Sequence, residues 1–279
     1  MRCFTEEWYQ VAQFMDFYEN LEESEQAAVF SEAYFQELYA LREADMLEMQ
    51  KLLPGMTFEE MFGISEETFS EFEDAATQYQ QVKETFEHMK KNRDPFDEVK
   101  EKENFAAFFQ GQIRTLQENL PPEILNEVAD IRVLALGAAT APVIEEITMF
   151  CEACRDAVYE IEENYSKYWD KFLKTHPDSF VQDFSLQDSV ILNLEQAEDQ
   201  EDQIVLHMDC VLSTTKCSAI HLHHAKLGTC EELPERAQWL MDELYEENGI
   251  YELHILMAQH EDESALRELT IQAEQIQLV

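Results

Sequence analysis

Residues 140–176 have the most regular hydrophobic pattern in the chain, and they constrain its fold most. Their apolar and aromatic side chains recur at steps of three and four residues, which places them on one stripe of an α-helix. The stripe consists of Ile147, Phe150, Cys151, Cys154, Val158, Ile161, Tyr165, Tyr168, Trp169 and Phe172. Thr140 suits the N-cap, and Pro177 is expected to end the helix. A helix this long needs other helices to cover its stripe, so we predict an α-helical body around it.

The preceding residues repeat this helical period. They predict helices over residues 5–21, 24–53, 65–86, 96–120 and 121–137, with a short segment at 58–62. Residues 1–177 are therefore expected to form a helical domain of about six helices. On the long helix, the residues that fall mostly off the apolar stripe are acidic: Glu145, Glu152, Asp156, Glu160 and Glu163.

Beyond residue 177 the hydrophobic period changes from 3.6 to 2. Strands are predicted over residues 189–194, 203–212, 218–227, 250–257 and 266–278. One helix is expected among them, over residues 234–247, because Ala237, Leu240, Met241 and Leu244 share a helical face and Asn248-Gly249 can end a helix. The short connections favour antiparallel pairing. We therefore predict an α+β protein, with a helical domain over 1–177 and an antiparallel β-sheet domain with one helix over 178–279.

The charge balance excludes several classes of partner. The chain has 60 acidic and 19 basic residues, which gives a formal net charge of −41. Binding to nucleic acid or to an anionic membrane needs clustered Lys and Arg, so neither is expected. A basic protein partner or a cation is favoured instead. The alternative is that the acidic helix faces only keep the protein soluble.

The location is predicted from the N-terminal residues, the hydropathy and the cysteines. The opening residues lack the hydrophobic run of a secretory signal, and the longest weakly charged window, residues 133–144, is too short to span a bilayer. The six cysteines are expected to be reduced thiols that pack as small hydrophobic residues. These features favour the cytoplasm.

Most catalytic motifs are missing from the sequence. The six glycines are too far apart to form a phosphate-binding or dinucleotide-binding loop, so no nucleotide cofactor is expected. Zinc-protease, di-iron and serine-hydrolase signatures do not occur either. Cys151 and Cys154 share one face in the middle of the long helix, where we predict core cysteines, with a metal or redox role as the alternative. Tyr165, Tyr168 and Trp169 are core residues or a partner-binding groove, and their helical spacing favours the core.

One cluster in the sheet domain has the chemistry of a metal site. The candidate ligands are His207, Asp209, His221 and His223. His207 and Asp209 project to one side of their strand, and His221 and His223 do so on the next. If the intervening turn brings these sides together, the four residues bind zinc or another transition metal. A one-residue slip would place Ile204, Leu206 and Met208 there instead, and the alternative is an exposed polar face.

Two segments resemble known bacterial proteins. The first is the opening stretch Met1-Arg2-Cys3-Phe4-Thr5-Glu6-Glu7-Trp8-Tyr9. It resembles the start of an uncharacterised bacterial family, a domain of unknown function, although Cys3 stands where that family has an aromatic residue. Residues 248–256 and 266–271 resemble the closing strands of small bacterial proteins, some of them immunity proteins. The resemblance implies a bacterial cytoplasmic protein and transfers no catalytic residue.

These observations lead to two hypotheses. The first is a non-enzymatic, immunity-like binding protein that neutralises a basic protein partner through its acidic surface and needs no cofactor. The alternative is a metal-dependent enzyme that uses the cluster from His207 to His223. Side chains that converge between the two strands would favour the enzyme.

Overall fold

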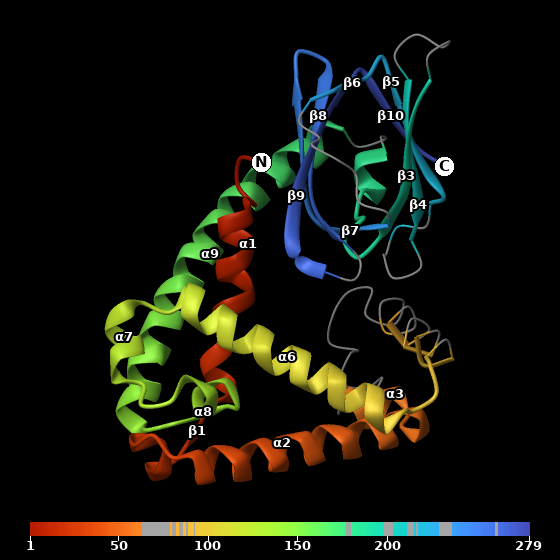
Figure 1. Ribbon diagram of the computed structural model, residues 1–279. Helices are drawn as coiled ribbons and strands as arrows, with labels where there is room; N and C mark the ends of the chain where they lie inside the picture. The colour runs from red at the N-terminus through yellow and green to blue at the C-terminus, as the bar shows by residue number, and fades with distance from the viewer. Residues whose placement is uncertain are drawn as a thin grey trace. The chain divides into compact units, whose positions relative to one another are not determined.

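A computed structural model describes residues 1–62, 79, 82–83, 86–87, 89–91, 93–176, 180–197, 203–210, 215, 217–228, 236–259 and 262–279. The chain divides into two compact units. One, Gln13–Asp156, is called the helical unit below. The other combines Met1–Ala12 with Ala157–Val279 and is called the sheet unit. Helices fill most of the N-terminal part and an antiparallel sheet fills the C-terminal part, so the predicted α+β class is confirmed (Figure 1).

Seven α-helices are described, and two of them, α1 and α9, contribute to both units. They are α1 (Glu6–Phe14), α2 (Glu32–Leu52), α3 (Phe58–Phe62), α6 (Glu98–Asn119), α7 (Pro122–Glu127), α8 (Ile131–Ala135) and α9 (Ala141–Thr175). Short 3₁₀ turns are η1 (Phe17–Asn20), η2 (Glu25–Ala28), η3 (Leu53–Gly55) and η4 (Phe180–Asp183). Most of the helix expected over residues 65–86, and Pro177, lie outside the described residues.

Helix α9 is the long helix that the hydrophobic period predicts. It begins one residue after Thr140, whose carbonyl accepts a hydrogen bond from the N–H of Ile144 at 3.0 Å. Ile147, Cys151 and Val158 are buried, as the stripe requires. The five acidic residues expected off the stripe are all exposed. The helix therefore covers a core with one face and presents carboxylates to solvent with the other.

Two predicted helices of the helical unit are interrupted by capping residues. Ser31 caps α2 by accepting a hydrogen bond from the N–H of Tyr34 at 3.3 Å, and Asp130 caps α8. Between α8 and α9, Gly137 has φ of 83°, and a Cβ there would meet the carbonyl of Asn20 at 2.9 Å. This close approach allows β1 (Glu22–Glu23) to pair in parallel with β2 (Ala138–Ala139).

Eight antiparallel strands are described in the sheet unit. They are β3 (Val190–Ala197), β4 (Gln203–Asp209), β5 (Ala219–His223), β6 (Lys226–Leu227), β7 (Ala237–Glu247), β8 (Ile250–Gln259), β9 (Asp262–Ala273) and β10 (Gln275–Leu278). Their order is β10-β5-β4-β3-β7-β8-β9-β6.

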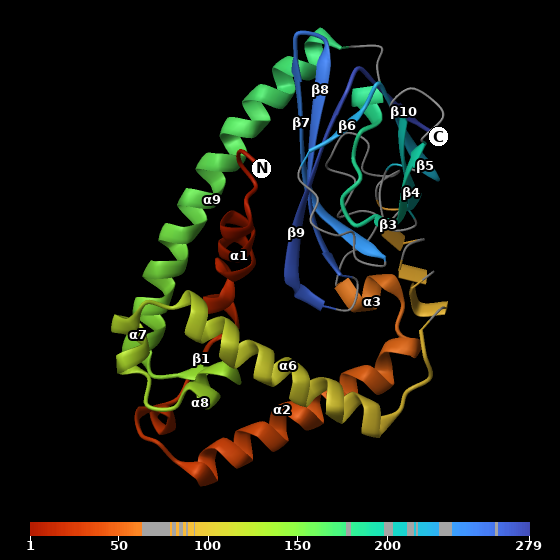
Figure 2. The same cartoon turned by 45° about the horizontal axis from the view of Figure 1, so that its top comes forward.

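The two ends of this order join. β5 pairs with β10 and β6 pairs with β9 in one continuous register, since His223 opposes Gln275 and Lys226 opposes Gln272. β5 and β6 therefore act as one bent strand, and so do β9 and β10. Because β10 and β6 stand at opposite ends of the order, this pairing closes the sheet on itself. Figures 1 and 2 show β7, β8 and β9 as one layer facing β3, β4 and β5. Val181, Phe184 and Leu186, in and just after η4, are buried in the core between the layers.

The helix predicted over residues 234–247 is wrong, because residues 237–247 form strand β7. Asn248 and Gly249 have φ of 56° and 81°, and they connect Glu247 to its partner Ile250. Two successive residues with positive φ form a tight hairpin turn whose twist matches that of the flanking strands. The Asn-Gly pair therefore begins a hairpin and does not end a helix.

Candidate binding site

The site lies in the sheet unit, where β3 and β7 separate. The two strands pair only from Val190↔Gln238 to Ile191↔Ala237, with the N–H of Trp239 also donating to the carbonyl of Ser189 at 2.8 Å. Farther along β7, where β3 no longer pairs with it, hydroxyl groups of α9 accept hydrogen bonds from the backbone of β7. The N–H of Leu244 donates to the hydroxyl oxygen of Tyr165 at 2.9 Å. Helix α9 therefore satisfies backbone groups of β7 that would otherwise lose their partners.

A β-bulge turns Asp242 toward the interior. The pairing of β7 with β8 shifts register between Trp239 and Met241, so β7 has one residue more than β8 at this point. After the bulge, Asp242 opposes Ile255, which belongs to the interior core. Without the extra residue, strict alternation would place Asp242 on the outer side. The bulge thus puts a carboxylate where the strand pattern would otherwise put an apolar side chain.

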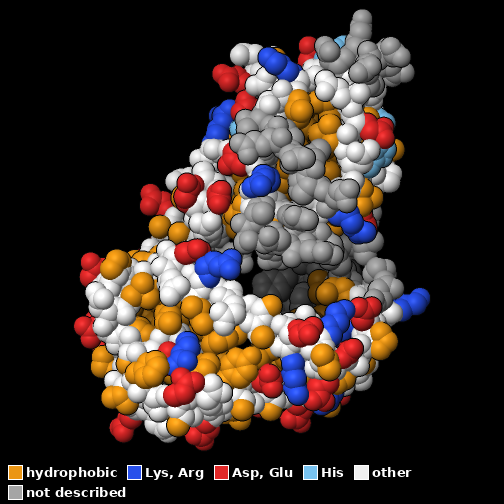
Figure 3. Space-filling model, in the orientation of Figure 1, with side chains coloured by type: hydrophobic (Ala, Val, Ile, Leu, Met, Phe, Trp, Pro, Cys, Tyr) orange, Lys and Arg blue, Asp and Glu red, His pale blue; other side chains and the backbone are white. Residues whose placement is uncertain are grey.

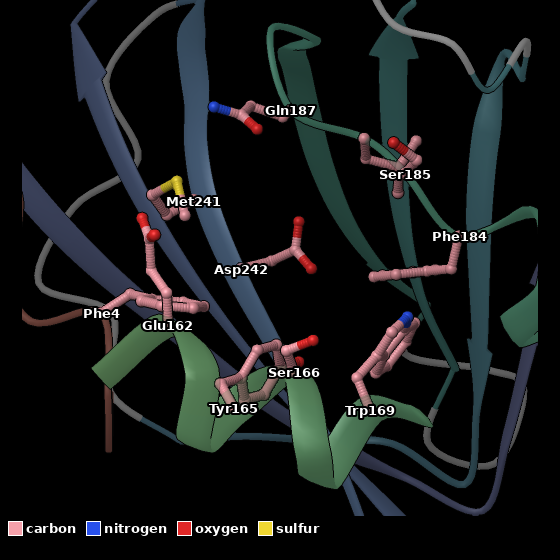
Figure 4. A pocket seen from close by; sticks show the side chains of 11 residues that line it. Phe4, Glu162, Tyr165, Ser166, Trp169, Phe184, Ser185, Gln187, Met241 and Asp242 are labelled. Carbon is pink, nitrogen blue, oxygen red and sulfur yellow. The ribbon is translucent and has the colours of Figure 1, made fainter. Parts of the chain in front are cut away.

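Asp242 contributes to the wall of a cavity of about 300 Å³ (Figure 4). The lining residues are Phe4, Glu162, Tyr165, Ser166, Trp169, Phe184, Ser185, Leu186, Gln187, Met241 and Asp242. Figure 4 shows the carboxylate of Asp242 projecting into the space between Trp169 and Ser166 on α9 and the segment that carries Ser185 and Gln187. Two carboxylates and four aromatic rings line the cavity, and none of these residues is Lys, Arg or His.

The environment of Asp242 disfavours its charged form. Burial raises the pKa of Asp242 to about 6, and the nearby charge of Glu243 acts in the same direction. The indole N–H of Trp239 donates to Oδ1 at 2.8 Å, and this hydrogen bond opposes the increase. Among the described residues, no cation forms an ion pair with Asp242. A carboxylate held in this state in a cavity is typical of a functional position.

Phe4 reaches the cavity wall because the N-terminal segment is anchored to β7. The N–H groups of Arg2, Cys3 and Phe4 all donate to the carboxylate of Glu243, at 2.8, 2.7 and 2.5 Å. The Tyr245 hydroxyl donates to the same carboxylate at 3.1 Å. The ring of Phe4 then packs edge-on against Tyr165, with centroids 4.9 Å apart. Of these two neighbouring residues of β7, Asp242 lines the cavity and Glu243 anchors the N-terminal segment.

No protein-family model, curated protein or solved structure matches this chain.

The sequence pattern identified part of this site and missed its centre. The sequence leaves Tyr165, Tyr168 and Trp169 as core or groove residues, and in the structure all three are half-buried. Tyr168 and Trp169 pack against the core, whereas Tyr165 and Trp169 line the cavity. Asp242 was missed because residues 234–247 were expected to be helical. The Asn-Gly pair at 248–249 was the signal that could have identified the strand, and only strand pairing then reveals the bulge.

The four predicted metal ligands all lie on the outer side of β4 and β5. The buried residues of these strands alternate with them, as the pattern of β4 shows. His207 opposes Ala219 and lies 3.3 Å from a carboxylate oxygen of Glu195, whereas His221 opposes Val205 and contacts Gln203 at 3.1 Å. Within the described part of the chain, no three His, Cys, Asp or Glu residues are grouped as metal ligands would be.

The metal site stays a prediction with a direct test. If these residues bind zinc, elemental analysis of gently purified protein will find one equivalent, and His221→Ala will lose it. Gln203→Ala, which removes the neighbour of His221 and leaves every candidate ligand, should keep the metal. Metal-free wild-type protein would contradict the prediction.

Cys151 fits the predicted core role. It is fully buried among the apolar residues of the helical unit, and burial raises its pKa to about 11. Burial also raises the pKa of Cys154, which is half-buried. Neither thiol is activated in this setting, since reactivity requires the thiolate.

The surface carries acidic side chains on both units, visible on the face shown in Figure 3. Large apolar side chains are also exposed on the helical unit, among them Phe30, Phe108 and Met149. In the part of the chain that the structure describes, no helix combines the length and the apolar character needed to cross a membrane.

Proposed function

We propose that this protein is a non-enzymatic binding protein for a basic polypeptide, and that a lysine or arginine side chain of the partner enters the cavity beside Asp242. The observation that carries this proposal is the carboxylate of Asp242, which points into an aromatic cavity and has no cation among the described residues. A bound cation would form an ion pair with Asp242 and pack against the faces of Trp169 and Tyr165. Both contacts strengthen when water is displaced.

The size and polarity of the cavity support a side chain as the occupant. A volume of about 300 Å³ is at the lower end of the range for small-molecule pockets. Ser166, Ser185 and Gln187 add oxygen acceptors around the carboxylate. A guanidinium group has several N–H donors in one plane and can use more than one of these acceptors. Arginine is therefore expected to bind more tightly than lysine.

The acidic surface supports a basic partner independently of the cavity. The exposed carboxylates of α9 form a stripe along its outer face, and the net charge of the chain is −41. Such a field attracts a basic polypeptide and raises the association rate. In this proposal the surface charge speeds the association of the basic polypeptide, and the cavity determines which of its side chains is bound. The resemblances of the two terminal segments and the expected reduced state of the cysteines favour a bacterial, cytoplasmic, immunity-like role.

The test measures the affinity for a short oligo-arginine peptide by calorimetry at about 0.15 M salt, where exposed charges are screened beyond about 8 Å. We expect wild-type protein to bind this peptide and not an oligo-glutamine peptide of equal length. Asp242→Asn should weaken binding at least about tenfold, which corresponds to about 1.4 kcal/mol. Affinity should also fall as the pH drops through 6, because Asp242 becomes protonated.

The matched control is Glu160→Gln, which removes one charge from the exposed face of α9. Both variants change the net charge equally, so a polycation held only by the overall field would respond alike to both. Equal affinities of Asp242→Asn and Glu160→Gln would rule out the cavity as the binding site.

A further inference from the structure

A second chemical site lies at the end of the β4–β5 hairpin. The sulfur atoms of Cys210 and Cys217 are 3.4 Å apart, although the residues are seven positions apart in the chain. The N–H of Met208 donates to the carbonyl of Ser218 at 2.9 Å, so the backbone is paired immediately beside both cysteines. The hairpin itself therefore holds the two thiols together.

The surroundings favour one thiolate shared by the pair. The thiol of Cys217 donates to Cys210 and lowers the pKa of Cys210 to about 6, despite burial; the hydroxyl of Ser189 also donates to this sulfur, at 3.4 Å. The same interaction and burial raise the pKa of Cys217. The pair thus loses its first proton easily and retains its second. This behaviour contrasts with Cys151 and Cys154, where burial raises both pKa values.

We propose that Cys210 and Cys217 are a redox-active dithiol that closes to a disulfide by exchange with a small disulfide such as oxidised glutathione. The proton that the pair retains moves from Cys217 to Cys210. Cys217, which is half-buried whereas Cys210 is buried, then attacks one sulfur of the small disulfide as the thiolate and releases one glutathione thiolate. Cys210 then gives up its proton, attacks the sulfur of Cys217 and releases the second glutathione. Two protein thiols are oxidised to one disulfide, the small disulfide is reduced to two thiols, and both protons end on glutathione.

The position of the pair links it to the candidate binding site. Thr215, in the connection between the two cysteines, accepts a hydrogen bond at its Oγ1 from the N–H of Ser185 at 3.1 Å. Its own N–H donates to the carbonyl of Ser185 at 3.3 Å. Ser185 lines the cavity. The redox site is therefore adjacent to the cavity wall, and its chemistry does not depend on what the cavity binds.

The experiment treats reduced full-length protein with oxidised glutathione, blocks the remaining thiols and maps the peptides without reduction. We expect a peptide that joins Cys210 to Cys217, the loss of two of the six thiols, and an intact mass lower by about 2 Da because two hydrogens leave. Dithiothreitol should restore all the thiols. Cys151 and Cys154 serve as an internal control in the same sample and should stay reduced.

Two variants complete the test. Cys217→Ser should abolish the loss of about 2 Da, because no second thiol remains to close the bond. Cys154→Ser should leave the cross-link unchanged. The proposal is overturned if the wild type keeps six thiols, if it stops at a stable mixed disulfide with glutathione, or if the cross-link joins other cysteines.

Discussion

Asp242→Asn is expected to make the protein more stable at neutral pH, by about 2 kcal/mol. The pKa of Asp242 is about 6 in the folded protein and about 3.9 in an unfolded chain. Between these values the unfolded state releases its proton while the folded state keeps it, so the stability of the wild type falls as the pH rises. The full difference corresponds to about 3 kcal/mol. We expect less because the side chain keeps some contact with solvent.

Asparagine removes this penalty and keeps the local hydrogen bond, because its oxygen can still accept from the indole N–H of Trp239. Urea unfolding at pH 7 and pH 4, followed by tryptophan fluorescence, measures the effect. The gain should be present at pH 7 and much smaller at pH 4, where the folded wild type is protonated at Asp242 and the unfolded chain is about half protonated. A variant that is equally or less stable than the wild type at pH 7 would contradict the expectation.

This result would separate stability from binding. A residue that costs stability and occupies a cavity is one that a functional requirement would retain. Asp242→Asn is therefore expected to gain stability and lose affinity for a basic peptide in the same protein. Loss of both would instead indicate that the variant disturbs the fold.

Glu243→Ala is expected to destabilise the protein by about 3–5 kcal/mol. Glu243 is 0% exposed and accepts hydrogen bonds from three consecutive backbone N–H groups and from the hydroxyl of Tyr245. Its removal leaves these donors unpaired near the interior. The N-terminal segment should detach from β7, and Phe4 should leave the cavity wall. Glu243 therefore supports the cavity although it does not line it.

Urea unfolding gives the loss of stability, and hydrogen exchange of the amides of residues 2–4 shows whether the segment is released. Glu195→Ala is the matched control, because it removes a carboxylate from the same sheet at a position whose side chain is 61% exposed. The control should change stability by less than about 1 kcal/mol and leave the amides protected. Similar small effects of both variants would show that the anchor contributes little.

The two acidic residues illustrate what the amino-acid pattern can and cannot predict. Alternation on strands such as β4 is visible in the sequence because each strand has one covered and one exposed side. In β7 the bulge breaks the alternation, and the apolar residues that remain fit a helical period. Residues such as Gln, Leu, Met and Glu also favour helices when considered alone. Pairing with β8 outweighs this local preference.

The sequence by itself determined the α+β class, the helix from residue 140 to its end near residue 176, and most of the strands. These features depend on local period and on capping or turn residues, which are encoded within a few positions. It also determined the acidic character of the surface. None of these properties requires knowledge of which distant segments meet.

Only the tertiary structure decided where the chemistry lies. The cavity combines residue 4, one side of α9, the segment after η4 and the bulge of β7, which are separated by up to more than two hundred positions. The pairing of Cys210 with Cys217 likewise depends on the register of a hairpin. Register and bulges are set by the total burial of both strands and not by any single window of sequence. For this reason the periodic pattern predicted the scaffold, while the position of Asp242 followed from the pairing of β7 with β8.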